Sequence, residues 1–392
     1  MTASVLAFGA WLKNAACWWH GGCAHWSPLH GDLSDPDACA ALEQSAGQLL
    51  AQAQQSGAPV QAIAHDLHPD FFSTQLALTM ADALGVPAIG VQHHHAHLAA
   101  VVTEHRIEGP VVGLALDGVG LGTDGAPWGG ELLWLDGPRW SRLGHLYPLA
   151  LPGGDRAARE PWRMAASVLH ALGRTGDIGP RFGPLVGQTQ ADGVRQMLTR
   201  GLNCPHTTST GRWFDAAAAA LGLSLRQQDE AEAAMALEQA AARAVQTPPA
   251  LPGVVIDDAN RLDPRALLAA LFDAGDVAQA AAGFHLALAD GLADWLIAAA
   301  RDRQTRIACL GGGCFFNRIL RARVLARLSQ AGLQAYLPGA MGCGDAGLAV
   351  GQAWVAAHAV RRSCALPLAG AEEIPFSFTL DNPLPEETAP CA

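Results

Sequence analysis

The stretch from residue 91 to residue 102 constrains the fold of this chain more than any other part of the sequence. It places four histidines in five positions, 93 to 97, ahead of an apolar run. If this segment is a helix, His93 and His97 are four residues apart and project from one face. Two imidazoles at that spacing can bind one metal ion, as in helical zinc motifs. An exposed polar turn is the alternative, and the spacing alone leaves both interpretations open.

The following segment favours a metal site. Residues 111 to 116 form an unbroken apolar run, which is typical of a buried strand. The run ends at Asp117, which a glycine follows. A carboxylate at the end of a buried strand, directly after a di-histidine helix, can supply a third, oxygen ligand to the same ion.

The composition is typical of a large globular protein. Of the 392 residues, 50% are hydrophobic and 16% are charged, so the chain can bury a sizeable core and its length indicates two domains or lobes. The sequence has no apolar run of about eighteen residues, and its N-terminus lacks a basic region followed by an apolar stretch. We therefore expect neither a membrane-spanning helix nor an export signal.

Cysteine usage and net charge limit the location and the partners. Nine cysteines are scattered along the chain, and none forms a Cys-x-x-Cys pair. This pattern supports neither a zinc ribbon nor a thioredoxin-like site, and it indicates a reducing cytoplasm. The formal net charge of −11 argues against a protein that holds a nucleic acid over a broad surface. We predict a cytoplasmic protein with neither a nucleic-acid nor a membrane partner.

The basic residues single out one position. Lys13 is the only lysine, and all the other basic residues are arginine. A compact ammonium differs in effect from a guanidinium fork, so Lys13 is a candidate functional group; chance survival of one surface lysine is the alternative. Lys13 and Asn14 lie between predicted strands at 5–10 and 15–20. At this bend they could hold a phosphate or a carbonyl group.

Other polar groups follow predicted strands or lie in glycine-rich turns. A strand at 60–64 runs into the polar segment 65–70, at the strand end where open α/β sheets bind ligands, although a plain polar loop explains it equally well. Glycine-rich turns at 118–131, 152–155 and 311–313 let backbone amides approach an anion. The last of these precedes a helix, whose N-terminal amides can face a phosphate. The turn at 118–131 matches neither the Walker nor the Rossmann pattern.

The C-terminal half adds two candidate ligands. Asn317, beyond the last glycine turn, could contact a base or a ribose. Asp345 lies at a predicted strand-to-helix turn, where a carboxylate can bind a metal or bridge to a phosphate. By contrast, His285 lies on the apolar face of a helix predicted at 276–301, and we interpret it as part of the core.

Seven motifs occur in the order that they have in a known family. They are Gly9-Ala10-Trp11-Leu12-Lys13-Asn14, Ala64-His65-Asp66-Leu67-His68-Pro69-Asp70, Gln92 to His97, Leu116-Asp117-Gly118 with Trp128-Gly129-Gly130-Glu131, Pro152-Gly153-Gly154-Asp155 with Glu160-Pro161-Trp162-Arg163, Gly312-Gly313 with Asn317, and Gly344-Asp345-Ala346-Gly347. Over residues 5–360 the chain thus resembles the C-terminal carbamoyltransferase domain of the HypF family of NiFe-hydrogenase maturation proteins. That domain is akin to the Kae/TsaD proteins of the actin-like ATPase (ASKHA) superfamily.

The resemblance implies an α/β fold of the two-lobed ASKHA type, in which ribonuclease-H-like lobes enclose a nucleotide cleft. We expect a first lobe at 1–109 and a second lobe at 110–361, with a helical insertion at about 155–250. The last helix could pack back on the first lobe. Residues 362–392 lack periodicity, and we expect a loosely ordered tail.

The resemblance also implies a chemistry. Family members use carbamoyl phosphate and ATP, form a carbamoyl-adenylate, and pass the carbamoyl group to the C-terminal cysteine of HypE for synthesis of the cyanide ligand. One divalent metal, iron or zinc, is implied here, and Mg²⁺ could accompany the ATP or AMP moiety. The implied metal ligands are His93, His97, Asp117 and Asp345. The implied catalytic groups are Lys13, Asn14, His93 and His97. The implied nucleotide-binding residues are Gly153, Gly154, Asp155, Gly312, Gly313 and Asn317.

The sequence departs from the family pattern in several places. Full-length members have acylphosphatase, zinc-finger and YrdC-like domains before this one, and here none precedes it, so we expect a separate YrdC-like activity to supply the adenylate. Trp11 stands where the family usually has Glu, Ala15 where it has Thr, Ala231 where it has Gly, and Phe316 where it has Gln. These residues are expected beside the nucleotide, where they could weaken its binding.

Three other functions compete with hydrogenase maturation. Transfer to a small-molecule hydroxyl is disfavoured by the order of the motifs, and tRNA threonylcarbamoyl transfer by the acidic balance. A non-catalytic nucleotide-binding auxiliary of a full-length HypF would explain the missing adenylate-forming domain. The complete set of metal-ligand candidates favours an enzyme.

Overall fold

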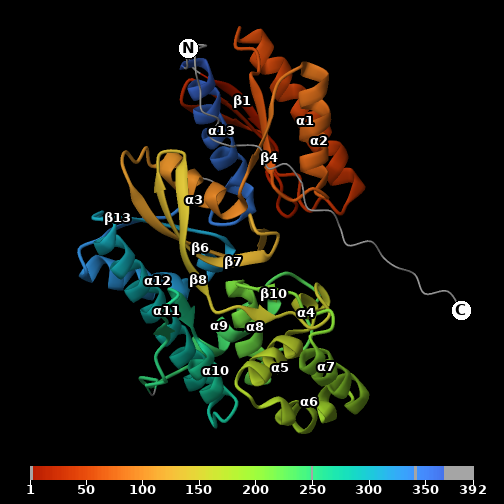
Figure 1. Ribbon diagram of the computed structural model, residues 1–392, viewed down its shortest axis with the longest axis vertical. Coiled ribbons are helices and arrows are strands. Elements are labelled where there is room, and N and C mark those ends of the chain that lie inside the picture. Colours follow the sequence, from red (N-terminus) through yellow and green to blue (C-terminus); the bar gives the residue numbers. More distant parts are fainter. Residues whose placement is uncertain (1–2, 249, 340–341, 366–392) are drawn as a thin grey trace, which may run out of the picture.

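Two β-sheets and the helices packed on them make up the protein (Figure 1). The computed structural model describes residues 3–248, 250–339 and 342–365. The first sheet has the order β3-β2-β1-β4-β5, in which β1, β4 and β5 are parallel and β1-β2-β3 is an antiparallel meander. Its strands are β1 (Ser4–Ala7), β2 (Cys17–His20), β3 (Cys23–Trp26), β4 (Ala62–Asp66) and β5 (Ala88–Val91).

Helices cover both faces of the first sheet. Helices α1 (Pro36–Gln55) and α2 (Phe72–Leu84) pack on one face over Leu6, Trp18 and Ile63. The helix α13 (Leu348–Ala365) packs on the other face against β1, β2 and β4, although it lies at the far end of the chain. It also crosses α3 (His93–Glu104). This crossing brings the C-terminal helix to the histidine-rich segment.

The second sheet has the order β11-β12-β8-β7-β6-β13-β14. Its strands β6 (Val111–Leu121), β7 (Pro127–Asp136) and β8 (Arg139–Leu146) form a meander, and β13 (Ile307–Gly311) and β14 (Gln334–Tyr336) run parallel to β6. Two short strands, β11 (Val255–Ile256) and β12 (Arg261–Asp263), extend the sheet beyond β8. Helices α10 (Arg265–Leu271), α11 (Val277–Asp302) and α12 (Arg318–Gln330) belong to the same half of the molecule.

A mostly helical segment separates β8 from β11, where the sequence predicts an insertion at 155–250. A two-stranded ribbon of β9 (Leu149–Ala150) and β10 (His206–Thr207) braces it. Its helices are α4 (Arg156–Arg159), α5 (Pro161–Ala171), α6 (Ile178–Val186), α7 (Gln188–Arg200), α8 (Thr210–Ala220) and α9 (Glu232–Ala241).

Helices α4 and α5 do not form one continuous helix, because the chain breaks at Glu160. The following residue, Pro161, has no amide to donate and disfavours the helical conformation at Glu160, whose φ and ψ are −124° and 77°.

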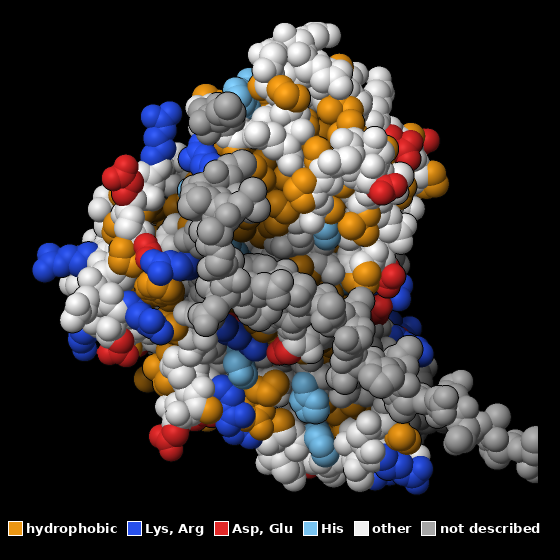
Figure 2. All heavy atoms as spheres, turned by 45° about the horizontal axis from the view of Figure 1, so that its top comes forward, with side chains coloured by type: hydrophobic (Ala, Val, Ile, Leu, Met, Phe, Trp, Pro, Cys, Tyr) orange, Lys and Arg blue, Asp and Glu red, His pale blue; other side chains and the backbone are white. Residues whose placement is uncertain are grey.

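Several surface arginines lie close to acidic side chains. On the face shown in Figure 2, arginine side chains are spread among acidic ones. Several are paired, as in Arg323–Asp290, whose nearest N···O distance is 2.7 Å. None of the described helices is both long and apolar enough to cross a membrane. The loosely ordered tail was expected from 362, but α13 continues to Ala365, so the expectation is wrong for residues 362–365. Residues 366–392 lie outside the described residues, and the lobe boundaries stay a prediction.

Candidate metal centre

Helix α3 begins directly at the edge of the first sheet and places its histidines there. Strand β5 ends at Val91, and Gln92 caps the helix by accepting a hydrogen bond from the His95 amide at 2.8 Å. The four histidine side chains of this turn are buried. The exposed polar turn considered above is therefore wrong, and the segment is a buried helix.

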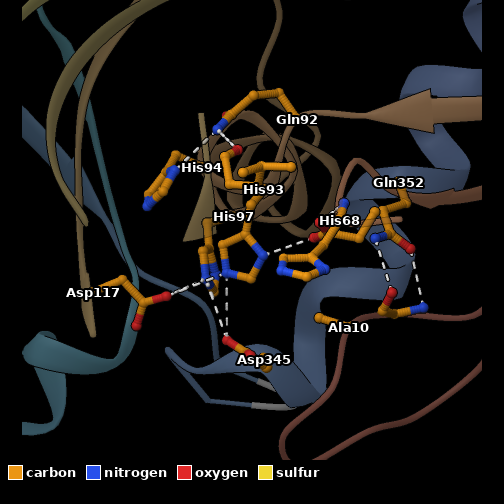
Figure 3. Close-up of polar contacts among 12 residues, drawn as sticks. Ala10, His68, Gln92, His93, His94, His97, Asp117, Asp345 and Gln352 are labelled. Atoms are coloured by element: carbon orange, nitrogen blue, oxygen red, sulfur yellow. Dashed lines mark hydrogen bonds and ion pairs between the residues drawn. The ribbon is translucent and has the colours of Figure 1, made fainter. Parts of the chain in front are cut away.

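Two of these histidines converge with two aspartates (Figure 3). One ligand atom from each of the four residues lies within 4.8 Å of every other. The Nε2 atom of His93 is 3.2 Å from Oδ2 of Asp117 and 3.7 Å from Oδ1 of Asp345. The corresponding distances from Nε2 of His97 are 3.4 and 3.5 Å. Residues more than two hundred positions apart thus meet at one point.

The geometry fits a metal ion. In a tetrahedral site with bonds of about 2.1 Å, neighbouring ligand atoms are about 3.4 Å apart. The four imidazole–carboxylate distances, 3.2 to 3.7 Å, match that separation. In addition, Nε2 of His97 is buried and makes no hydrogen bond of acceptable geometry within the described residues. Two imidazoles and two carboxylates suit zinc or ferrous iron better than magnesium, which prefers oxygen ligands.

Neighbouring charges shift the pKa values of these residues in the direction opposite to the effect of burial. Burial alone lowers the pKa of His93, but Asp66 and Asp117 raise it well above its usual value. Burial raises the pKa of Asp117, yet the His93 and His97 imidazoles beside its carboxylate hold it well below its usual value. The pKa of His97 is raised by Asp117 and Asp345 against the same effect of burial. Because a metal must displace protons from these imidazoles, its affinity falls as the pH falls through their raised pKa values.

The two remaining histidines of the turn are not part of this group. Burial lowers the pKa of His95 to about 3 and that of His94 well below its usual value. The His95 ring stacks on Trp140 with a centroid distance of 5.4 Å. Both residues are therefore packed as neutral rings.

The aspartates are held by irregular backbone. Strand β6 loses its register with β7 between Leu116 and Gly120, and Asp117 lies in this bulge. Its Oδ1 accepts a hydrogen bond from the Gly313 amide at 3.0 Å, so the other carboxylate oxygen faces the histidines. Asp345 begins a 3₁₀ turn directly before α13. The four side chains thus come from helix α3, from the bulge in β6 and from the turn before α13.

Two cavities adjoin the four residues, and Asp117, Gly118, Arg212, Glu230 and Ala231 line both. The first has a volume of about 240 Å³, and its further lining includes Arg159, Gln227 and Asp345. The second, of about 350 Å³, has an apolar wall formed by Phe214, Ala234, Met235 and Phe316. Sequence reasoning missed Arg212, Asp215 and Gln227, because these residues belong to the helical insertion and reach the cavities only through its packing.

Lys13 and Asn14 have different surroundings. Lys13 lines the second cavity and pairs with Glu230 across it, with Nζ 2.8 Å from Oε2. Burial lowers the Lys13 pKa, but Glu230 outweighs burial and raises it. Asn14 is fully buried and donates to the carbonyls of Phe8 and Ala10, both at 2.7 Å. Its side chain therefore shapes the loop that presents Lys13 and lines neither cavity.

The predicted nucleotide-binding residues are only partly brought together. Gly313 and Asn317 line the second cavity. The Asn317 amide is already engaged, since it caps α12 and lies 2.9 Å from Nε2 of the buried His285. Gly312 packs against the backbone of Leu116. The turn at 153–155 lies in neither cavity lining.

Of the four residues that depart from the family pattern, two line these cavities and two do not. Ala231 lines both cavities and Phe316 lines the second. Trp11 instead contacts Phe71, with ring centroids 5.6 Å apart, and Ala15 is fully buried. Neither lines either of these two cavities, and the expectation that all four residues lie beside the nucleotide stays a prediction.

Ala231 adopts a backbone conformation that favours glycine, with φ at +61°. We expect Ala231→Gly to stabilise the protein by about 1 kcal/mol, because a left-handed residue with a Cβ costs about that much. Urea unfolding measures the change. Ala234→Gly, in the regular part of the same helix, is the matched control and should destabilise by about 1 kcal/mol. Equal losses in both variants would contradict the strain at Ala231.

Comparisons with known proteins agree with the fold and identify the family. A model of the HypF Kae1-like domain matches residues 1–104, and one described as the second subdomain of the Kae1-like carbamoyltransferase domain matches residues 113–352. A carbamoyltransferase HypF homolog of Cupriavidus necator is 55% identical over 399 residues, covering 100% of this chain and 97% of the relative. Carbamoyltransferase HypF2 of the same organism is 45% identical over 379 residues, covering 90% of this chain and 46% of the relative.

Two solved structures share the fold. Full-length HypF in a phosphate- and nucleotide-bound form superposes with a TM-score of 0.81 at 30% identity, over 91% of this chain and 46% of that one. For HypF of T. kodakarensis the TM-score is 0.82 at 29% identity, over 92% of this chain and 48% of that one. The chain spans about half of these proteins and of HypF2. The predicted two-lobed α/β fold is confirmed, and the chain belongs to the HypF family, matching both subdomains of its Kae1-like carbamoyltransferase domain.

Proposed function

We propose that this protein is a carbamoyltransferase of NiFe-hydrogenase maturation, which passes the carbamoyl group of a carbamoyl-adenylate to the C-terminal cysteine of HypE. The observation that carries the proposal is the convergence of His93, His97, Asp117 and Asp345 beside two cavities. A scaffold that only bound nucleotide would not need this buried, charged group. We further propose a cytoplasmic location and a separate YrdC-like activity that supplies the adenylate.

The second cavity suits the adenosine part of the donor. Its apolar wall, which includes Phe214, Met235 and Phe316, can cover a purine ring. Asp215 and Glu230 in the same lining offer carboxylate acceptors for ribose hydroxyls. The 350 Å³ volume lies in the usual range for small-molecule sites. Because Asp117 lines this cavity too, a nucleotide here would have its phosphate near the four-residue group.

The reaction needs charge compensation as AMP leaves. A zinc or ferrous ion bound by the four residues would polarise the carbamoyl or phosphate oxygen as a Lewis acid. Lys13 offers a second positive charge at the same cavity, and its half-exposed ammonium can leave Glu230 for a phosphate. Gly313, whose amide binds Asp117, keeps the second carboxylate oxygen directed at the histidines. The nucleophile comes from the partner, so no internal catalytic triad is required.

Mass spectrometry of the acceptor tests the proposal. Purified protein is incubated with carbamoyl-adenylate and HypE, and we expect HypE to gain the mass of one carbamoyl group at its C-terminal cysteine. A HypE variant lacking that cysteine is the control. With carbamoyl phosphate and ATP alone, we expect no transfer until a YrdC-like protein is added. Unmodified HypE in the presence of the adenylate would contradict the proposal.

A non-catalytic auxiliary of a full-length HypF is the second candidate. The observation that favours it is the strained backbone of Ala231, which lines the proposed nucleotide cavity. Nucleotide binding without carbamoyl transfer, together with stimulation of a full-length relative, would support this alternative.

A further inference from the structure

Asp66 reaches the candidate metal centre from behind His93. It ends strand β4 and is fully buried. Its two carboxylate oxygens have different partners. Oδ2 accepts a hydrogen bond from Nδ1 of His93 at 2.8 Å, and Oδ1 accepts one from the His68 amide at 2.9 Å. One oxygen therefore holds the local turn, and the other holds a ring of the four-residue group.

The contact decides which nitrogen of His93 can bind a cation. The two ring nitrogens of an imidazole lie on opposite sides, and a neutral ring has a proton on only one of them. With Asp66 accepting from Nδ1, the lone pair belongs to Nε2, the atom that lies 3.2 Å from Asp117. Within the described residues, His93 is the one histidine of this turn whose Nδ1 contacts a carboxylate, whereas Nδ1 of His94 lies 3.0 Å from the Gln92 amide nitrogen.

The buried charge of Asp66 also favours a cation bound to Nε2 of His93. A fully buried carboxylate is costly unless a positive charge or several hydrogen bonds compensate it. The Asp66 carboxylate has no arginine or lysine among its contacts in the described part of the chain, and its ion pair is with His93. A cation on the far side of the His93 ring would polarise the Nδ1–H bond toward Asp66 and supply the missing compensation.

We propose that Asp66 is a positioning residue of the metal centre, which fixes His93 with its proton on Nδ1 and thereby directs Nε2 at the cation. The inference rests on the metal site of the proposed function and is independent of carbamoyl transfer. A purely local role in the turn requires only the oxygen that binds the His68 amide. The two roles can therefore be separated by a substitution that keeps one oxygen.

Asp66→Asn is that substitution. The asparagine oxygen can still accept from the His68 amide, which places the NH₂ group against Nδ1 of His93. The ring must then accept at Nδ1 and bear its proton on Nε2, where it blocks the metal. We expect the variant to unfold in urea like the wild type but to bind Zn²⁺ about 10- to 100-fold more weakly, as measured by chelator competition. Asp70→Asn, at an exposed position in the same segment, is the matched control and should keep wild-type affinity.

Nitrogen NMR of histidine-labelled protein reads the ring directly. In the wild type with Zn²⁺, we expect the His93 signal to show a proton on Nδ1 and coordination through Nε2, with His93→Gln identifying the signal. In Asp66→Asn we expect the proton on Nε2. Wild-type zinc affinity in Asp66→Asn, coordination of wild-type His93 through Nδ1, or an unchanged proton position in the variant would each overturn the inference. Because neither measurement uses HypE, failure of carbamoyl transfer would not be confused with failure of this role.

Discussion

His93→Ala and His97→Ala, made singly, are each expected to remove bound metal and carbamoyl transfer while the protein stays folded. Each histidine supplies one of four ligand atoms that lie within 4.8 Å of one another. Structural zinc sites bind with about 10–16 kcal/mol, so one ligand of four is worth roughly 3 kcal/mol, or a factor of about 100 in affinity. Two carboxylates and one imidazole would remain. Metal content by mass spectrometry, chelator competition and the HypE assay measure the losses.

His95→Ala is the matched control for these variants. His95 belongs to the same turn of α3 and is equally buried, but its ring stacks on Trp140 and is outside the four-residue group. We expect the control to lose stability from the removed packing, by about 1–3 kcal/mol, and to retain metal. If His93→Ala and His97→Ala retained wild-type metal and transferred carbamoyl at the normal rate, the four-residue group would not be a metal centre.

The metal-ligand group could be predicted because each member lies at a point that local sequence defines. Two histidines four residues apart on a helix must share a face, and an apolar run predicts a buried strand that leads to the following aspartate. The expected strand end at Asp117 is wrong, because β6 continues to Leu121 and Asp117 lies in its bulge. The structure brings Asp117 and Asp345 to that same point. The spacing of His93 and His97 could not show that His94 and His95 would also be buried, since α3 is covered on all sides by α13, β6 and β13.

The surroundings of the group were harder to predict because they depend on packing between distant segments. Asp66 was visible as a polar residue after a strand, but nothing local indicates that one oxygen reaches His93. Asn14 looked like a ligand-binding amide, yet the bend it occupies needs that amide for its own carbonyls. Arg212 and Glu230 reach the cavities only because α8 packs against β6 and α9 packs against α8. For Asp66, Arg212 and Glu230 the deciding contact joins distant segments whose proximity the sequence pattern does not encode, whereas the Asn14 contacts are local to its bend.

Gly351→Ala is expected to weaken the metal centre without altering any ligand. Gly351 lies where α13 crosses α3, and a Cβ there would be 1.9 Å from the Ala96 carbonyl oxygen and 2.9 Å from the Ala100 amide nitrogen. Both atoms are backbone, so no side chain can move aside. Ordinary contacts need about 3.5 Å, so the two helices must separate by more than about 1 Å. Helix α3 presents His93 and His97, and Asp345 directly precedes α13, so the separation opens the group.

We expect Gly351→Ala to lower the free energy of unfolding by about 1–3 kcal/mol and zinc affinity by at least about 10-fold, because metal sites tolerate displacements of only about 0.2 Å. Urea unfolding and chelator competition measure the two effects. Gly193→Ala is the matched control, since Gly193 lies inside α7 with nothing within 4 Å of an added Cβ. It should stabilise the protein by about 0.5–1 kcal/mol and leave zinc binding unchanged. Wild-type zinc affinity in Gly351→Ala would show that the crossing of α3 and α13 does not set the distance between Asp345 and the two histidines.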